Sequence, residues 1–395
     1  MSFKRYTIAL LAALLLLFAL NALFNRIVDP YWFFQDPEIK GFNVDKPRFP
    51  RNERLVKPAL LLRFAPEAVI VGSSYAEVGL PPTHPGFTDK GRLKPYNFAM
   101  SGAQWPEVYC MALFALERSP LQTMVLGGAS GTIAAACPGQ SDYGKPDYAK
   151  LLLSKNAYDA SWETLRKQDG KPRITREGLW YYKRYEEKIQ TDNDIALNFV
   201  DEMRLRFCKA PVPQDQPVDY RAIHQSPALG DEESRGLRDI IRLAIKKNVR
   251  LVLLNYPKHV FYYEMDRRCG RTVADWTYLW QLVSLAEAEA GADSTLVEVW
   301  DFHGYRDVNG ERVHAGKKMS ARLWQDIGHF NHELGTIMFD SIFSGGTAYG
   351  SRVTRKNFDD RIAASERERQ AFIAANPWVT AELDELTRLA GPVRK

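Results

Sequence analysis

An apolar segment near the N-terminus constrains this chain more than any other feature. Residues 7–24 are dominated by Leu, Ala, Ile and Phe, and Asn21 is the one break in the apolar pattern. A helix of this length is about the minimum that crosses the roughly 30 Å hydrocarbon core of a bilayer. The sequence therefore predicts that residues 7–24 bind the chain to a membrane as a single spanning helix.

The charges that flank this segment predict its orientation. Lys4 and Arg5 precede it, whereas Arg26 and Asp29 follow it and nearly cancel. By the positive-inside rule, the N-terminus stays in the cytoplasm and the rest of the chain lies outside. A cleaved signal peptide is the alternative, but its apolar region spans about 7–15 residues and ends in a small-x-small site. Residues 20–22 (Leu-Asn-Ala) match such a site poorly, so we favour an uncleaved anchor.

The composition after the anchor is that of an ordinary globular protein. About 370 residues remain, which is too long for a minimal domain but suits one α/β domain with a large insertion. Apolar residues make up 45% of the chain and charged residues 26%. The 53 basic and 48 acidic residues are mixed along the sequence, so the net charge of +5 forms no basic run. We therefore exclude nucleic acid as a partner.

The cysteine pattern argues against zinc and thioredoxin-like chemistry, because no two cysteines form a C-x-x-C pair. An extracytoplasmic location permits disulfides. The four cysteines, which are Cys110, Cys137, Cys208 and Cys269, allow three pairings that the sequence cannot distinguish. A Cys137–Cys208 bond would close the insertion described below, and isolated buried thiols are an equally good alternative.

Five short apolar runs have the length of buried parallel strands. They are Ala68–Val71, Tyr96–Ala99, Met124–Leu126, Leu251–Leu254 and Val297–Phe302. Segments with helical spacing separate most of them. This alternation predicts a five-stranded, doubly wound parallel sheet in a three-layer α/β/α domain. In such sheets ligands bind beyond the carboxyl ends of the strands.

The same patterns predict the organisation of the chain. The expected parts are an anchor at 1–25, a linker at 26–65, an α/β domain at 66–345 with an insertion at about 130–236, and a charged helical tail at 346–395. Within the linker, Tyr31 and Trp32 suit the headgroup layer of a membrane. The insertion contains an aromatic cluster at Trp180–Tyr185, which either packs locally or stacks on sugar rings.

The first candidate for chemistry follows the first strand. The sequence Gly72-Ser73-Ser74 places hydroxyl groups at the carboxyl edge of the predicted sheet, and a following helical turn would offer free N–H groups to an oxyanion. The pattern is weak alone, because strand–Gly–Ser turns also bind phosphates or cap helices.

The second candidate is Asp326 with His329. An Asp three residues before a His can orient the imidazole through Nδ1 and leave the other nitrogen free to take a serine proton. A helix cap with a surface histidine is the alternative for this pair alone. Asp301 and His303 could form a rival pair, although loop packing or support of the site is the favoured role there. Asn255 is a further candidate for lining a pocket, or simply a turn residue.

Together these motifs resemble those of the SGNH/GDSL hydrolase superfamily. In that family the last residue of a G-D-S block is the nucleophile, which corresponds here to Ser74, with Ser73 in place of the Asp. The family's D-x-x-H block corresponds to Asp326 and His329. The resemblance extends over roughly residues 68–343, apart from the insertion. It implies an acyl-serine mechanism with no metal or organic cofactor.

The same resemblance implies an oxyanion hole built from backbone and side-chain donors. The N–H groups of Ser74 and Gly102 take the first two positions. The third block of the family reads G-x-N-D, but here residues 127–130 read Gly-Gly-Ala-Ser and lack the Asn. Removal of one such donor typically costs about 10²–10³ in rate. Either Gly128 N–H, Ser130 or a group from the insertion replaces it, or the enzyme is slow or inactive.

Among members of the family, the chain looks similar to membrane-anchored bacterial proteins that act on cell-surface polymers, such as the D-alanine transfer protein of teichoic acids and the alginate O-acetylation proteins. That resemblance implies a place in the bacterial cytoplasmic membrane with a periplasmic domain. It also implies esterase or O-acyltransferase activity on a carbohydrate polymer, with an acyl donor and a multi-span membrane acyltransferase as candidate partners. The alternatives are a catalytically degenerate module that binds glycan or scaffolds a membrane assembly, and a lipase-like enzyme.

Overall fold

In the computed structural model, residues 3–128, 144–168, 172–181, 195–206, 208, 217–227, 231–313, 322–345 and 349–390 are described. The chain forms two compact units. The first consists of Met1–Phe64 and Pro138–Tyr181, and the second of Ala65–Cys137 and Tyr182–Lys395. The segment between the third and fourth strands is therefore divided between both units.

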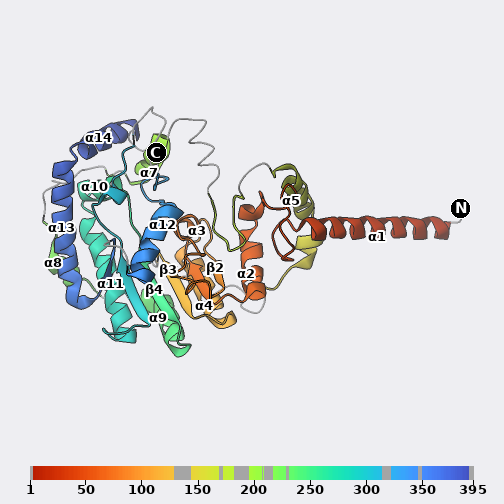
Figure 1. The fold of residues 1–395 in the computed structure, drawn as a ribbon, viewed down its shortest axis with the longest axis horizontal. Coiled ribbons are helices and arrows are strands. Elements are labelled where there is room, and N and C mark those ends of the chain that lie inside the picture. Colours follow the sequence, from red (N-terminus) through yellow and green to blue (C-terminus); the bar gives the residue numbers. More distant parts are fainter. Residues whose placement is uncertain are drawn as a thin grey trace. The chain divides into compact units, whose positions relative to one another are not determined.

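The first unit begins with the expected apolar helix, α1 (Phe3–Val28), which is drawn in red in Figure 1. Its most apolar window has a mean hydropathy of 2.5 and no buried residue, so it is long and apolar enough to cross a membrane. The other elements are η1 (Phe49–Arg51), α2 (Glu53–Phe64), η2 (Ala149–Leu153) and α5 (Lys155–Arg166).

Residues 26–65 were expected to form a linker, and residues 26–64 belong to this compact unit. Tyr31 and Trp32 are each only 2% exposed, so neither side chain is available to lipid headgroups. Trp32 lies 5.7 Å from Phe49, measured between ring centroids. Aromatic residues before a domain can sit in lipid or in a core, and only the tertiary packing decides between these environments.

The second unit contains a six-stranded mixed sheet in the order β2-β1-β3-β4-β5-β6. The strands are β1 (Ala68–Val71), β2 (Pro95–Asn97), β3 (Thr123–Gly127), β4 (Arg250–Asn255), β5 (Val297–Asp301) and β6 (Ser351–Val353). The first five are parallel and overlap the five expected runs, whereas β6 pairs antiparallel with β5. The prediction of a purely parallel, five-stranded sheet is therefore wrong at this edge, because three residues with one apolar side chain give no strand signal.

Helices surround this sheet. They are α3 (Ser74–Gly79), α4 (Trp105–Arg118), α7 (Ile195–Arg206), α8 (Tyr220–His224), α9 (Asp231–Lys246), α10 (Val260–Arg268), α11 (Thr272–Ala290), α12 (His332–Phe339), α13 (Phe358–Ala375) and α14 (Trp378–Ala390), with short turns η3 (Asp307–Asn309), η4 (Asp340–Ser344) and η5 (Arg355–Asn357). Helices α4, α9 and α11 contact β1, β4 and β5, respectively (Figure 1). Alternate strand residues such as Ile70, Val125 and Val252 form one buried cluster with α3 and α12.

A disulfide joins Cys208, just beyond α7, to Cys269 at the end of α10. The suggested Cys137–Cys208 pairing is therefore wrong, and Cys137 itself lies outside the described residues. The two bonded cysteines are 61 residues apart, with Cα atoms separated by 5.6 Å. That closeness results from tertiary packing, which spacing along the chain does not encode. Of the Trp180–Tyr185 cluster, only Trp180 and Tyr181 are described, and they belong to the first unit.

Candidate functional site

Ser74 is the first residue of α3, directly after the turn that ends β1. Ser73 occupies the N-cap position with an extended backbone (φ −97°, ψ −160°), and its carbonyl accepts the first helical bonds from Ala76 and Glu77. A Cβ at Gly72 would lie 2.9 Å from both the Ala76 Cβ and the Tyr256 hydroxyl oxygen. Glycine at position 72 is thus required by close packing, and this packing brings the Ser74 hydroxyl to the edge of the sheet.

Ser74, His329 and Asp326 form one continuous hydrogen-bonded series. The Ser74 Oγ lies 2.9 Å from His329 Nε2, and His329 Nδ1 lies 2.7 Å from Asp326 Oδ2. The carboxylate can only accept, so Nδ1 carries the proton, which leaves Nε2 free to accept from the serine hydroxyl. The other carboxylate oxygen accepts from the N–H groups of Gly328 and His329, each at 2.7 Å. The arrangement can transfer the serine proton to the imidazole and stabilise the resulting imidazolium.

The loop that carries Asp326 and His329 is a tight hairpin closed by backbone bonds. Trp324 and Phe330 form an antiparallel bridge, and the Gln325 N–H donates to the His329 carbonyl at 2.8 Å. The Trp324 indole N–H donates to the Val308 carbonyl at 2.6 Å. The Asp326 carboxylate binds N–H groups two and three residues later, which is a local preference of Asp in turns. The same side chain thus shapes the loop and orients the imidazole.

Tyr75 packs directly against the imidazole of His329. The two rings are parallel within 4°, with centroids 4.2 Å apart, and Tyr75 also stacks on Tyr256 at 5.6 Å. A Cβ at Gly328 would lie 2.7 Å from the Tyr75 hydroxyl, so this position accepts only glycine without movement. The sequence reasoning missed this contact, although Tyr75 directly follows Ser74.

Two charged side chains lie near the ring stack. The Lys258 ammonium nitrogen is 3.9 Å from the Tyr75 ring centroid, and burial together with the Arg206 charge lowers the pKa of Lys258 to about 8. Burial, together with the Asp326 carboxylate, raises the pKa of Glu202 on α7. Nothing in the sequence linked these residues to the site, because Glu202 and Lys258 lie 127 and 71 residues before His329 in the chain.

Three backbone N–H groups occur at the carboxyl ends of adjacent parallel strands. Ser74 follows β1, Gly102 follows β2 and Gly128 follows β3, and β1 lies between the other two. Gly102 and Gly128 have φ values of +69° and +73°, which glycine adopts without steric cost. Within the described residues, none of the three N–H groups donates a hydrogen bond. They are the donors that this edge of the sheet offers to an anion.

Asn255, Asp301 and His303 do not join the Ser74 cluster. The Asn255 amide donates to Asp301 Oδ1 at 2.7 Å, which ties the ends of β4 and β5 together. Asp301 also pairs with Arg361 at 2.8 Å, so it is not the partner of a histidine base. His303 is stacked against Tyr263, with centroids 3.9 Å apart. Ser130 lies outside the described residues.

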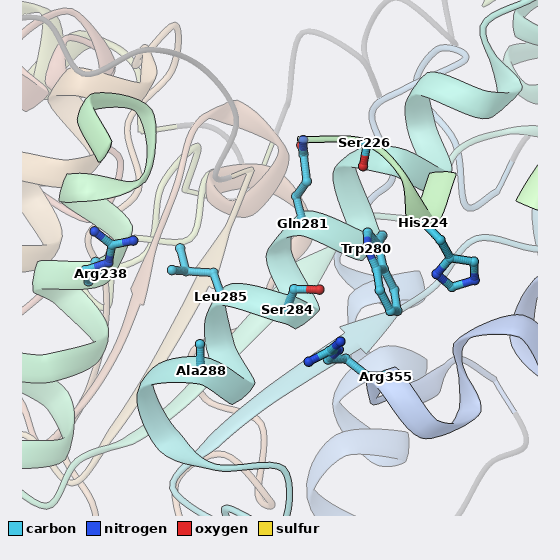
Figure 2. A pocket seen from close by; sticks show the side chains of 9 residues that line it. All are labelled: His224, Ser226, Arg238, Trp280, Gln281, Ser284, Leu285, Ala288 and Arg355. Atoms are coloured by element: carbon cyan, nitrogen blue, oxygen red, sulfur yellow. The ribbon is translucent and has the colours of Figure 1, made fainter. Parts of the chain in front are cut away.

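A separate cavity of about 300 Å³ lies among α8, α9, α11 and η5 (Figure 2). Its lining residues are His224, Ser226, Arg238, Trp280, Gln281, Ser284, Leu285, Ala288 and Arg355. None of them was a candidate from the sequence and none is a member of the Ser74 series. In the part of the chain that the structure describes, no three His, Cys, Asp or Glu side chains are placed to hold a metal ion.

His259 contacts the hairpin that carries Asp326 and His329. Its backbone N–H donates to the Ile327 carbonyl at 3.0 Å. Its imidazole ring is fully buried and bonds the Glu311 carbonyl through Nε2 at 2.8 Å. Nδ1 accepts from the Phe261 N–H at 3.3 Å. Burial lowers the pKa of His259 to about 3. The ring therefore stays neutral in the fold, with both nitrogens bonded.

Acid is expected to destabilise the second unit through this histidine. Because an unfolded histidine has a pKa of about 6.5, the unfolded chain binds one more proton than the fold between about pH 6.5 and about pH 3. Stability should fall through that window by about 1.4 kcal/mol per pH unit, or about 2 kcal/mol by pH 5. Thermal unfolding of wild type and His259→Gln at pH 7 and pH 5 measures this. If wild type and His259→Gln lost the same stability between pH 7 and pH 5, His259 would not be the source of the acid sensitivity.

No family model and no curated protein matches this sequence.

Proposed function

We propose that this chain is a membrane-anchored serine enzyme of the SGNH type that performs acyl-ester chemistry on a cell-envelope glycan. The observation that carries the proposal is the hydrogen-bonded series from Ser74 through His329 to Asp326, with distances of 2.9 and 2.7 Å. A serine, a neutral imidazole and an orienting carboxylate in this order constitute an activated nucleophile.

In the proposed reaction, His329 Nε2 takes the Ser74 proton while Oγ attacks the acyl carbonyl carbon. The tetrahedral intermediate collapses, its alcohol leaves with the proton from His329, and an acyl-serine ester remains. A second hydroxyl compound then loses its proton to His329, attacks the ester and takes the acyl group, and His329 returns the proton to Ser74 Oγ as that oxygen leaves. Water as the second nucleophile gives an esterase, and a sugar hydroxyl gives an O-acyltransferase.

The oxyanion of this intermediate needs donors, and the backbone N–H groups of Ser74, Gly102 and Gly128 are the proposed set. Their freedom from other hydrogen bonds among the described residues supports this role. Gly128 would supply the donor that the missing Asn provides in the resembled family. Backbone dipoles held by a sheet need no reorganisation as charge develops, which makes them effective in this role.

The location completes the proposal. Helix α1 would anchor the chain in the bacterial cytoplasmic membrane with its N-terminus inside, because Lys4 and Arg5 precede the apolar segment. The two units would then lie in the periplasm, where a glycan emerging from the membrane is the proposed substrate. A multi-span acyltransferase would be a suitable source of acyl groups on that side.

A fluorophosphonate probe tests the nucleophile. We expect it to label wild type, to label Ser73→Ala at a similar rate and to leave Ser74→Ala unlabelled, because only Ser74 bonds to His329. Circular dichroism would check that each variant is folded. A folded wild-type protein that takes up no label would overturn the enzyme proposal and favour the glycan-binding or scaffold alternative.

A labelled protein leads to the second question, which is the acceptor. The full chain in detergent, incubated with an acetyl-ester donor and candidate oligosaccharides, should yield either acetylated sugar or free acetate, which mass spectrometry distinguishes. Released fatty acid from phospholipid would favour the lipase-like alternative.

A further inference from the structure

One side of the last two turns of α1 is packed into the first unit, where Asn25 and Val28 are buried, whereas Leu23 and Ile27 on these turns remain exposed. The Asn25 amide donates to the Leu152 carbonyl at 2.8 Å, and its oxygen accepts from Ser161 at the same distance. The Asn21 amide donates to the Leu153 carbonyl at 3.3 Å. The strongly polar side chains in the apolar part of α1 are thus satisfied by η2 and α5.

The end of α1 is also closed by a buried lysine. The Lys46 ammonium is fully buried and donates to the carbonyls of Val28 and Asp29, at 3.2 and 2.5 Å. A cation at this position satisfies carbonyl groups that a helix end leaves free. Helix α1 therefore enters the first unit as a fixed element and not as a flexible tether.

The length of α1 then determines where a bilayer must end. If Arg5 marks the cytoplasmic boundary, a core of about 30 Å at 1.5 Å per residue takes about 20 residues and reaches residue 25. A tilted helix would reach still further along the chain. Asn21 and Asn25 therefore lie at the outer boundary of the hydrocarbon, and the segments that bind them, η2 and α5, must reach the same level.

The side chains that surround this level are apolar and exposed. Leu153, Tyr158 and Trp162 are 42%, 42% and 40% exposed. Phe24 of α1 contacts two of them, with ring centroids 5.7 Å from Tyr158 and 5.4 Å from Trp162. The exposed face of α1 is thus continuous with an exposed apolar surface on η2 and α5.

We propose that Leu153, Tyr158 and Trp162 form a lipid-binding collar that lies in the headgroup layer of the outer leaflet around the exit of α1. The inference rests on the proposed anchoring by α1 but not on the proposed chemistry at Ser74. Tyr and Trp suit this layer because their rings are apolar and their polar groups reach water. The Arg166 guanidinium, 5.4 Å from the Trp162 ring centroid, can remain in the aqueous layer above it.

Quenching by brominated lipid tests the collar. The full chain is placed in phosphatidylcholine nanodiscs with brominated acyl chains, and tryptophan emission is compared with that in unbrominated discs. We expect Trp162→Phe to remove most of the emission that the bromolipid quenches. The matched control Trp280→Phe, on α11 of the second unit, should leave the quenched emission unchanged.

The possible failures are distinguishable. If the chain stays in the discs through an alkaline wash but Trp162→Phe leaves the quenched emission unchanged, the collar is overturned while the anchor stands. The collar is also overturned if Trp162 is covered by a second copy of the chain, which crosslinking in the discs would detect. A chain that leaves the discs overturns the anchor and the collar together, and loss of fluorophosphonate labelling affects neither.

Discussion

Asp326→Asn is expected to slow fluorophosphonate modification of Ser74 by about 10⁴-fold, the size of effect that loss of the orienting carboxylate has in a serine–histidine–aspartate triad. The Asp326 carboxylate accepts the His329 Nδ1 proton at 2.7 Å. An Asn amide can present a donor instead, which would favour protonation at Nε2. That tautomer cannot accept the Ser74 proton, so Ser74 would lose its proposed base while the fold keeps its shape.

The chain provides a matched control for this substitution. Asp359 bonds His224 at 2.7 Å in the second unit and is not part of the Ser74 series. Asp359→Asn should label at the wild-type rate, and thermal unfolding of both variants would show whether either has lost its fold. Equal labelling of wild type and Asp326→Asn would contradict the assigned base.

Gly335→Ala should cost about 3 kcal/mol of stability and most of the reactivity of Ser74. The new Cβ would lie 1.7 Å from the carbonyl oxygen of Gly79, which is backbone and cannot rotate away. Overpacking of this kind typically costs about 1–3 kcal/mol, and a rigid neighbour favours the upper end. Gly79 ends α3, which begins with Ser74, and Gly335 is in α12, which follows His329 closely. Movement of the two helices apart should lengthen the Ser74–His329 bond.

Thermal unfolding and the rate of fluorophosphonate labelling measure the two effects. Gly304→Ala is the control, because its Cβ would meet only the far ends of two flexible side chains, the Glu368 carboxylate at 3.2 Å and Arg306 Nε at 4.0 Å. We expect that variant to match wild type in labelling and to lose well under 1 kcal/mol. A Gly335→Ala protein that is as stable and as reactive as wild type would contradict the close crossing of α3 and α12.

Several elements were predictable because their signal is local. The apolar run that became α1 and the runs that became β1 to β5 are readable from hydropathy over a few residues. Asp326 and His329 lie three residues apart, so a single turn can bring their side chains together. The pairing of Ser74 with His329 came from the order of motifs along the chain.

Other features depend on contacts between distant segments. Strand β6 exists because β5 offers it an edge, and the Cys208–Cys269 bond joins segments 61 residues apart. Lys258 reaches the Tyr75 ring from beyond β4. No periodic or compositional pattern predicts this strand, this disulfide or this contact, because each is stabilised by packing between segments that are distant in the sequence.

The sequence by itself determined that a helix long enough to span a membrane begins the chain and that strands alternate with helices after it. It also determined that a strand-end serine precedes an Asp-x-x-His motif along the chain. Only the tertiary structure decided that Tyr31 and Trp32 are buried while Tyr158 and Trp162 are exposed beside α1. The physical reason is that burial depends on which surfaces meet, and an aromatic side chain suits a core and a membrane boundary equally well.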